Sequence, residues 1–439
     1  MNERFDILVV GAGPAGIAAA VSAANSGKRV ALVDDNTAAG GQIWRSGDSQ
    51  PTAARMWLAK LNTSPVTRLQ GWRVFDSPNR GVLRMERDGG FRDLGYGKLI
   101  LATGARERFL PFPGWTLPNV MGAGGLDAMV RGGLPIDGKR VVVAGTGPLL
   151  IAVAAHLARR GAKVVAICEQ APLRQLISFA AHLMREPAKL LQGFEHGMAT
   201  LGAKFNTGCW PVAANGRERL ETVTVERNEK RWDECCDYLG CGFHLVPNLE
   251  LPALMGCRTQ DGFVAVDDQL RTSVDDVFCA GEPTGIGGVE LSLMEGEIAG
   301  LATAGRWDAA EKLARRRRRR LGFVRALQDA TALDPRLKTL ATDSTIVCRC
   351  EDVSFGRLRE QTSWRSAKLH TRCGMGPCQG RVCGAATEFL FGWDLASVEF
   401  SVRPPVFPAL VSSLGAPVTL NCQDESFAAA GASQLKEKR

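Results

Sequence analysis

The sequence predicts an α/β protein with two dinucleotide-binding-type domains followed by a small cysteine-rich domain. Three observations lead to this prediction. An apolar strand, a glycine turn and a helix follow one another near residue 11 and again near residue 145, and five of the 13 cysteines lie between residues 348 and 383. At 439 residues the chain is too long for one compact core, and its 45% hydrophobic and 23% charged residues are typical of a soluble globular protein.

The first unit covers residues 5–34. Gly11 allows a tight turn, Gly13 lets the backbone approach a pyrophosphate, and Gly16 lets the helix pack closely on the strand. The next apolar run ends on a carboxylate at the spacing expected for the acid that binds a ribose hydroxyl. A chance glycine turn would lack this second strand and acid. We therefore predict a dinucleotide site formed by Gly11, Gly13, Pro14, Ala15, Gly16, Asp34 and Asp35.

Three later segments favour FAD over NAD as the dinucleotide. A glycine pair follows the ribose acid, a strand near residue 100 ends in small residues, and a strand near residue 278 ends in a glycine and an acid. Three unrelated glycine turns are the alternative. These pieces, in this order, resemble the flavoprotein disulfide-reductase superfamily over about residues 1–310. The resemblance implies two Rossmann-like domains, one inserted into the other, and one extended FAD that also contacts Gly41, Gln42, Ala102, Thr103, Gly104, Gly281 and Glu282. Residues 106–115 are expected to form an exposed turn that leaves this domain.

The second unit begins near residue 139 and predicts a nucleotide site at Gly145, Gly147 and Glu169. It departs from the pattern of the superfamily, because Leu150 replaces the third glycine and Ala152 stands where a glutamate near the nicotinamide is common. No arginine pair follows Glu169 to receive a 2′-phosphate. The sequence therefore disfavours NAD(P)H and leaves open a different nucleotide or none.

The cysteines between residues 348 and 383 form a C-x-C pair and a C-x4-C pair, with Cys373 between them. Thiolates on glycine-containing loops are suited to iron–sulfur clusters, whereas zinc pairs usually run C-x2-4-C. The segment resembles the bacterioferritin-associated-ferredoxin-like [2Fe–2S] domain, also found at the end of anaerobic glycerol-3-phosphate dehydrogenases, over about residues 345–390. The resemblance implies the cluster ligands Cys348, Cys350, Cys378 and Cys383. Cys373 stands where an apolar residue is usual, so an alternative ligand set stays open.

The net charge of +8 comes mainly from six consecutive arginines at positions 315–320, without which it is near +2. No aromatic residues are interleaved with them, so a solvated, helix-compatible linker is favoured over a nucleic-acid interface; the remaining alternative is contact to an acidic partner subunit.

No apolar stretch is long enough to span a bilayer, and the chain enters a strand directly, so a cytoplasmic location is expected. Peripheral contact to the inner membrane through the electron acceptor is left open. The predicted domains are a discontinuous FAD domain (1–120 and 262–310), a second nucleotide-binding-type domain (121–261), an arginine-rich linker (311–340), a [2Fe–2S] domain (341–395) and a tail (396–439).

Together these parts resemble the α subunit of heteromeric flavin-dependent amino-acid dehydrogenases, which include hydroxyproline and proline dehydrogenase, opine oxidase and hydrogen cyanide synthase. The resemblance implies an FAD-containing β subunit that oxidises the imino acid or opine, with a small ferredoxin-like γ subunit left open. This chain would then transfer electrons. No catalytic residue is assigned, because the five histidines lie in no motif and no C-x-x-C pair lies beside the flavin segments. The alternatives are a self-sufficient NAD(P)H-dependent flavin reductase and a nucleic-acid-binding iron–sulfur regulator.

Overall fold

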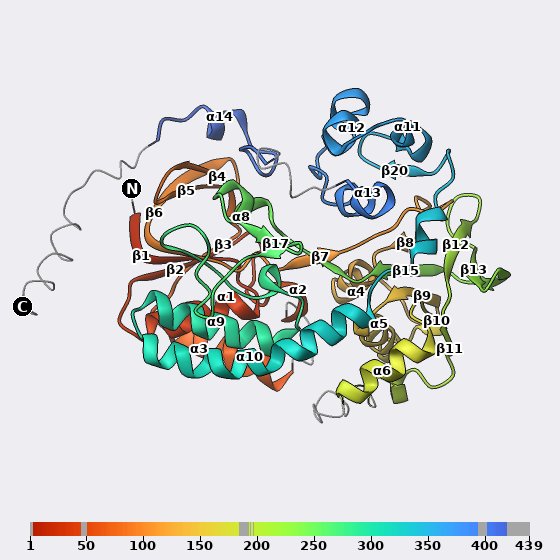
Figure 1. Ribbon diagram of the computed structural model, residues 1–439, viewed down its shortest axis with the longest axis horizontal. Coiled ribbons are helices and arrows are strands. Elements are labelled where there is room, and N and C mark those ends of the chain that lie inside the picture. Colours follow the sequence, from red (N-terminus) through yellow and green to blue (C-terminus); the bar gives the residue numbers. More distant parts are fainter. Residues whose placement is uncertain are drawn as a thin grey trace, which may run out of the picture.

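The structure, a computed structural model, describes residues 3–44, 51–183, 193, 195, 197–393 and 402–418. The predicted α/β class is confirmed: two sheets with covering helices precede a small cysteine-containing unit (Figure 1). Most of the predicted tail, residues 396–439, lies outside the described residues. Among the helices of the described part, none combines the length and the hydropathy needed to cross a bilayer.

The first sheet is built around β1, whose C-terminal half is buried on both faces. β1 pairs in parallel with β2 on one side and β6 on the other, and the long β6 also pairs in parallel with β19 and antiparallel with β5. The strand order is β3-β2-β1-β6-β5-β4, with β19 added next to β6. The strands are β1 (Glu3–Val10), β2 (Val30–Asp34), β3 (Thr67–Gln70), β4 (Arg73–Asn79), β5 (Val82–Arg87), β6 (Gly90–Leu101) and β19 (Val277–Cys279).

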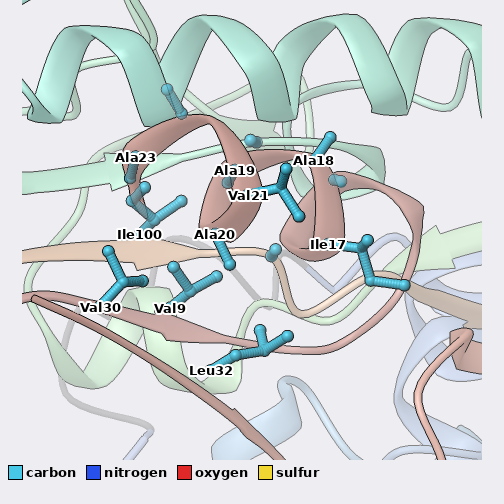
Figure 2. Packing of buried hydrophobic residues seen from close by; sticks show 14 of the residues in the cluster. Val9, Ile17, Ala18, Ala19, Ala20, Val21, Ala23, Val30, Leu32 and Ile100 are labelled. Carbon is cyan, nitrogen blue, oxygen red and sulfur yellow. The ribbon is translucent and has the colours of Figure 1, made fainter. Parts of the chain in front are cut away.

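Helix α1 (Pro14–Ala24) lies between the first sheet and α9 (Val289–Thr303). Its alanines are small enough to bring both layers close: Figure 2 shows Ala20 pointing toward Val9 and Val30 of the strands, whereas Ala18 points toward α9. A Cβ placed on Gly296 of α9 would lie only 2.1 Å from the carbonyl oxygen of Ala15. The alanine-rich sequence of α1 therefore fixes a tight helix pair over the sheet. Two further helices of this domain are α2 (Gly41–Trp44) and α3 (Thr52–Thr63).

Two connecting strands join the second domain to the first. β7 (Ala105–Glu107) leads out of the first sheet, β16 (Leu245–Pro247) returns, and the two pair antiparallel. The expectation of an exposed turn over residues 106–115 was wrong, because Leu110 and Phe112 are fully buried in the second core. Leu251, beyond β16, packs against the first sheet. We therefore propose that the second boundary lies near residue 248 rather than 261; the other boundaries stay predictions.

The second sheet has the order β11-β10-β9-β15-β8, and all its pairs are parallel. Along β9, Val141 and Val143 face helices α4 and α5, whereas Val142 and Ala144 face the three-stranded antiparallel sheet β12-β13-β14. This alternation buries both faces. The elements are β8 (Val120–Met121), α4 (Ala123–Arg131), β9 (Arg140–Thr146), α5 (Pro148–Arg159), β10 (Lys163–Glu169), α6 (Leu173–Leu183), β11 (Lys204–Thr207), β12 (Trp210–Asn215), β13 (Thr222–Arg227), β14 (Lys230–Cys235) and β15 (Tyr238–Phe243).

The arginine run lies in the middle of α10 (Trp307–Ala330), a 24-residue helix that packs on α9. The helix agrees with the expected helix-compatible segment, but the expectation that the run is solvated was wrong for Arg317. Its side chain is 8% exposed and its Nε lies 2.7 Å from Oε1 of Glu295 in α9. A buried guanidinium is tolerated because this carboxylate pairs with it.

The C-terminal unit forms a small core of its own from Val347, Leu358, Trp364, Ala367 and Trp393, together with three of the cysteines. Trp115 of the second domain donates from Nε1 to the carbonyl oxygen of Ile346 at 2.6 Å, which fixes this unit to the rest of the chain. The remaining elements are α8 (Glu250–Leu254), β17 (Thr259–Gln260), β18 (Phe263–Val264), η1 (Glu282–Thr284), η2 (Pro335–Thr339), β20 (Ile346–Cys348), β21 (Val353–Ser354), α11 (Phe355–Arg359), α12 (Trp364–Thr371), α13 (Cys383–Phe391) and α14 (Val411–Leu414).

Candidate dinucleotide and cluster sites

The loop between β1 and α1 is packed too tightly for side chains. A Cβ on Gly11 would lie 2.2 Å from the carbonyl oxygen of Ala102, and a Cβ on Gly16 would lie 1.7 Å from the carbonyl oxygen of Gly11. Gly11 also adopts a φ of 103°, which L side chains rarely adopt. These contacts bring the end of β6 against the start of α1, where free helix N–H groups favour a phosphate.

Other predicted residues gather around this loop. A Cβ on Gly41 would lie 2.9 Å from Cα of Gly13, and a Cβ on Gly281 would lie 2.8 Å from Cβ of Ala15. Pro14 stands at the first turn of α1. The three separated glycine segments therefore meet at one helix N-terminus, as a single extended ligand requires.

The two acids at the end of β2, Asp34 and Asp35, take different positions. The Asp34 carboxylate accepts hydrogen bonds from the backbone N–H of Ala12 at 2.5 Å and of Asn36 at 2.7 Å, so it stays beside the glycine loop. Asp35 is exposed and lies 3.7 Å from Arg73. Gln42 is exposed as well. Of the two acids, Asp34 is thus the one that lies beside the glycine loop.

Asn248 is a site residue that the sequence reasoning missed. Its backbone N–H donates to the carbonyl oxygen of Gly104 at 3.0 Å, its Nδ2 donates to the carbonyl oxygen of Thr103, and its own carbonyl accepts from Oγ1 of Thr103, both at 2.8 Å. The only sequence signal is its place directly after β16. Glu282 lies near this loop, and burial raises the pKa of its carboxyl group, opposed by a hydrogen bond from the backbone of Ala105.

In the second domain, Gly145, Gly147 and Glu169 repeat the same geometry. The backbone N–H of Gly147 donates to Oε2 of Glu169 at 2.8 Å, as that of Ala12 does to Asp34. Burial raises the pKa of the Glu169 carboxyl group. Leu150, which replaces the third glycine, is fully buried between α5 and the sheet.

The chain itself covers the second glycine loop. The methyl group of Thr331, just after α10, lies 3.2 Å from the position of a Cβ on Gly147. Gln170 holds this segment through two hydrogen bonds. Its Nε2 donates to the carbonyl oxygen of Ala332 at 2.9 Å, and its Oε1 accepts from the backbone N–H of Asp334 at 3.0 Å. A nucleotide bound at this loop therefore has to share space with residues 331–334.

The five clustered cysteines form two groups. The sulfur atoms of Cys348, Cys373 and Cys383 all lie within 4.8 Å of one another and are buried. Hydrogen bonds from the Cys373 and Cys383 thiols lower the pKa of Cys348, which favours the thiolate form that metals bind. This group contains two of the predicted ligands and the residue whose role the sequence left open.

Cys350 and Cys378 form the second group, in which their thiols contact each other. Gly376 permits this approach, since a Cβ there would lie 2.4 Å from Cβ of Cys350. Tetrahedral metal ligands with metal–sulfur bonds of about 2.3 Å have sulfur atoms roughly 3.8 Å apart. Each group can therefore supply two thiolates to one metal ion. The sulfur chemistry fits an iron–sulfur cluster, and the ligand assignment stays a prediction.

The two sites and the two-domain fold define a flavoprotein-type oxidoreductase. The chain belongs to the pyridine nucleotide-disulphide oxidoreductase family, whose family model matches residues 5–304. The predicted oxidoreductase class is thereby confirmed, and family membership supports FAD as the cofactor of the first domain.

Two relatives and one solved structure are similar to this chain over most of its length. The chain is 31% identical to a subunit of the opine oxidase of Rhizobium meliloti (strain 1021), over 92% of this chain and 97% of that protein. It is 29% identical to hydrogen cyanide synthase subunit HcnB of Pseudomonas protegens, over 91% and 97% respectively. The crystal structure of L-proline dehydrogenase from P. horikoshii is similar in fold, with a TM-score of 0.65 and 18% sequence identity. The alignment covers 95% of this chain and 81% of the dehydrogenase chain. The resemblance predicted from the sequence is confirmed, and the chain belongs with these opine oxidase and hydrogen cyanide synthase subunits.

Proposed function

We propose that this chain is the electron-transferring subunit of a heteromeric, flavin-dependent dehydrogenase that oxidises an imino acid, an amino acid such as D-hydroxyproline or proline, or an opine at a partner flavoprotein subunit. The observation that carries the proposal is the presence of a dinucleotide loop and a two-group thiol site in one chain, connected by direct contacts. The relatives named as subunits of opine oxidase and hydrogen cyanide synthase support the partner. A small ferredoxin-like third subunit belongs to the same proposal.

The proposed division of labour follows from what each site can do. When bound, FAD would accept two electrons and release them singly, and a [2Fe–2S] cluster would carry one electron at a time. The loop at Gly11, Gly13 and Asp34 would hold the nucleotide part of the FAD, while Ala102, Gly104 and Gly281 would lie along it. Cys348 with Cys383 and Cys350 with Cys378 would each supply two thiolates to one iron.

A partner-dependence experiment tests this proposal. We expect the purified chain to be yellow-brown, to contain flavin, iron and acid-labile sulfide, and to oxidise proline, D-hydroxyproline or opines only after its partner subunit is added. The measurement is dye reduction by the chain alone and by the co-purified complex. Rapid substrate oxidation by the chain alone, or a preparation with flavin but without iron, would contradict the proposal.

We also expect NADH and NADPH to leave the flavin oxidised. Leu150 replaces the glycine of a nucleotide loop, and residues 331–334 lie against that loop, so the phosphates of a pyridine nucleotide would have to share space with them. Anaerobic stopped-flow mixing, with dithionite as the positive control for a reducible flavin, measures this directly. Rapid bleaching by NADH would favour the alternative of a self-sufficient NAD(P)H-dependent reductase.

A further inference from the structure

Arg106 of β7 contacts both candidate sites at once. Its Nε donates to the carbonyl oxygen of Arg381 at 2.9 Å, and Arg381 lies in the loop between Cys378 and Cys383. On the other side its Nη1 donates to Oδ1 of Asn248 at 2.7 Å. Asn248 in turn holds Thr103 and Gly104 through the three hydrogen bonds described above. One guanidinium therefore links the loop predicted to touch the flavin to the loop that carries two predicted cluster ligands.

A shared carboxylate reinforces this link. Oε1 of Glu250, at the start of α8, lies 2.9 Å from Nη1 of Arg106 and 3.7 Å from Nε of Arg381. The three side chains are 16–27% exposed, so solvent screens the ion pairs only in part. The negative charge of Glu250 thus offsets the repulsion between the guanidinium groups of Arg106 and Arg381, which belong to different domains.

The cluster loop is held from its other side as well. Nη1 of Arg381 donates to the carbonyl oxygen of Cys378 at 3.3 Å, and Nη2 donates to that of Val406 at 2.7 Å. The guanidinium of Arg381 also lies 3.9 Å from the ring centre of Phe407. The loop between the two cysteines is therefore held within itself and by residues 406 and 407, and Arg106 joins it directly to the Asn248 side chain that binds Thr103.

We propose that Arg106 is a positioning residue for electron transfer: it holds the Cys378–Cys383 loop against the flavin loop at Thr103 and Gly104 and so sets the separation of the two redox centres. This inference rests on the proposed function. Electron transfer slows steeply as two centres move apart, so a contact that fixes their separation controls the rate. Arginine suits the role because its planar fork presents donors in several directions, whereas lysine offers one compact ammonium.

The test compares Arg106→Lys with Arg359→Lys in the full chain purified with its cofactors. Arg359 is the matched control, because it pairs with Asp343 inside the C-terminal unit and spans no domain boundary. Flavin, iron and sulfide contents and the midpoint potentials of both centres are measured first. A laser flash then reduces the flavin, and the transfer rate is read from the absorbance of flavin and cluster. Hydrogen exchange of residues 376–383 reports how firmly the loop is held, in a measurement that needs no catalytic turnover.

We expect Arg106→Lys to keep both cofactors and their potentials, to speed hydrogen exchange in the loop, and to slow the transfer by about tenfold or more, because the rate of electron transfer falls steeply as the separation of the two centres grows. Arg359→Lys should match the unmodified chain in every measurement. A normal rate in Arg106→Lys, or a slow rate explained by cofactor loss or a shifted potential, would overturn the inference while the proposed function stands.

Two further outcomes are distinguishable. If the unmodified chain transfers no electron from flavin to cluster, the proposed function itself fails. If Arg106→Lys does not fold, Glu250→Gln decides, because it removes the shared charge and keeps a side chain of the same shape. Slower transfer with intact cofactors in Glu250→Gln supports the inference, and an unchanged rate refutes it.

Discussion

Replacing Arg317 by alanine is expected to lower the free energy of unfolding by about 3–5 kcal/mol, the usual cost of removing one partner of a buried ion pair. The substitution leaves the Glu295 carboxylate, 1% exposed, without its cation. The other oxygen of Glu295 accepts from the backbone N–H of Gly281 at 2.8 Å and from Oγ1 of Thr284 at 2.7 Å. The same substitution should therefore loosen the loop at Gly281 and release the flavin at a lower temperature. Urea unfolding followed by circular dichroism, with flavin fluorescence on heating, measures both effects.

The arginine run supplies its own control for this experiment. Arg319 lies two positions away on the exposed side of α10, so Arg319→Ala should change the free energy of unfolding by no more than about 0.5 kcal/mol. A second variant, Arg317→Met combined with Glu295→Gln, removes both charges and should recover part of the loss. Equal stability of Arg317→Ala and Arg319→Ala would show that the buried pair contributes nothing to the fold.

The sequence predicted the parts of the fold that depend on local pattern and spacing. A strand, a glycine turn and a helix have a fixed geometry, so Gly11, Gly16 and Asp34 could be placed around one loop from the pattern alone. This prediction depends on backbone shape, which glycine and apolar periodicity determine directly. The insertion of one domain into the other came instead from the resemblance to the flavoprotein disulfide-reductase superfamily.

Other features could not be predicted, because identical residue types occupy different environments. Six arginines follow one another in the run, and only the helical position of Arg317 relative to α9 makes it the buried member of the run. Asn248 has no motif, and its role depends on the return of β16 beside β7. Cys373 could not be assigned from spacing either, since the same x4 interval precedes Cys378 and Cys383. In each case long-range packing decides the role.

The largest cofactor effect is expected for Cys348. Its sulfur lies within 4.8 Å of those of Cys373 and Cys383, at the end of β20, and the resemblance assigns it as a cluster ligand. Cys348→Ser should remove nearly all iron and acid-labile sulfide and leave the flavin bound, because the first domain has a separate core. The visible absorbance spectrum and chemical analysis of iron, sulfide and flavin in one anaerobic preparation give the result.

Cys373→Ala is the matched control for this cluster experiment, since Cys373 is as buried as Cys348 and belongs to the same sulfur group. If the ligands are Cys348, Cys350, Cys378 and Cys383, Cys373→Ala keeps its iron and Cys378→Ala loses it. The opposite pattern, with iron lost from Cys373→Ala and kept in Cys378→Ala, would replace Cys378 by Cys373 in the ligand set. Retention of iron in Cys348→Ser would show that this thiolate is not required, and loss of that iron when Cys373→Ala is added would assign its place to Cys373.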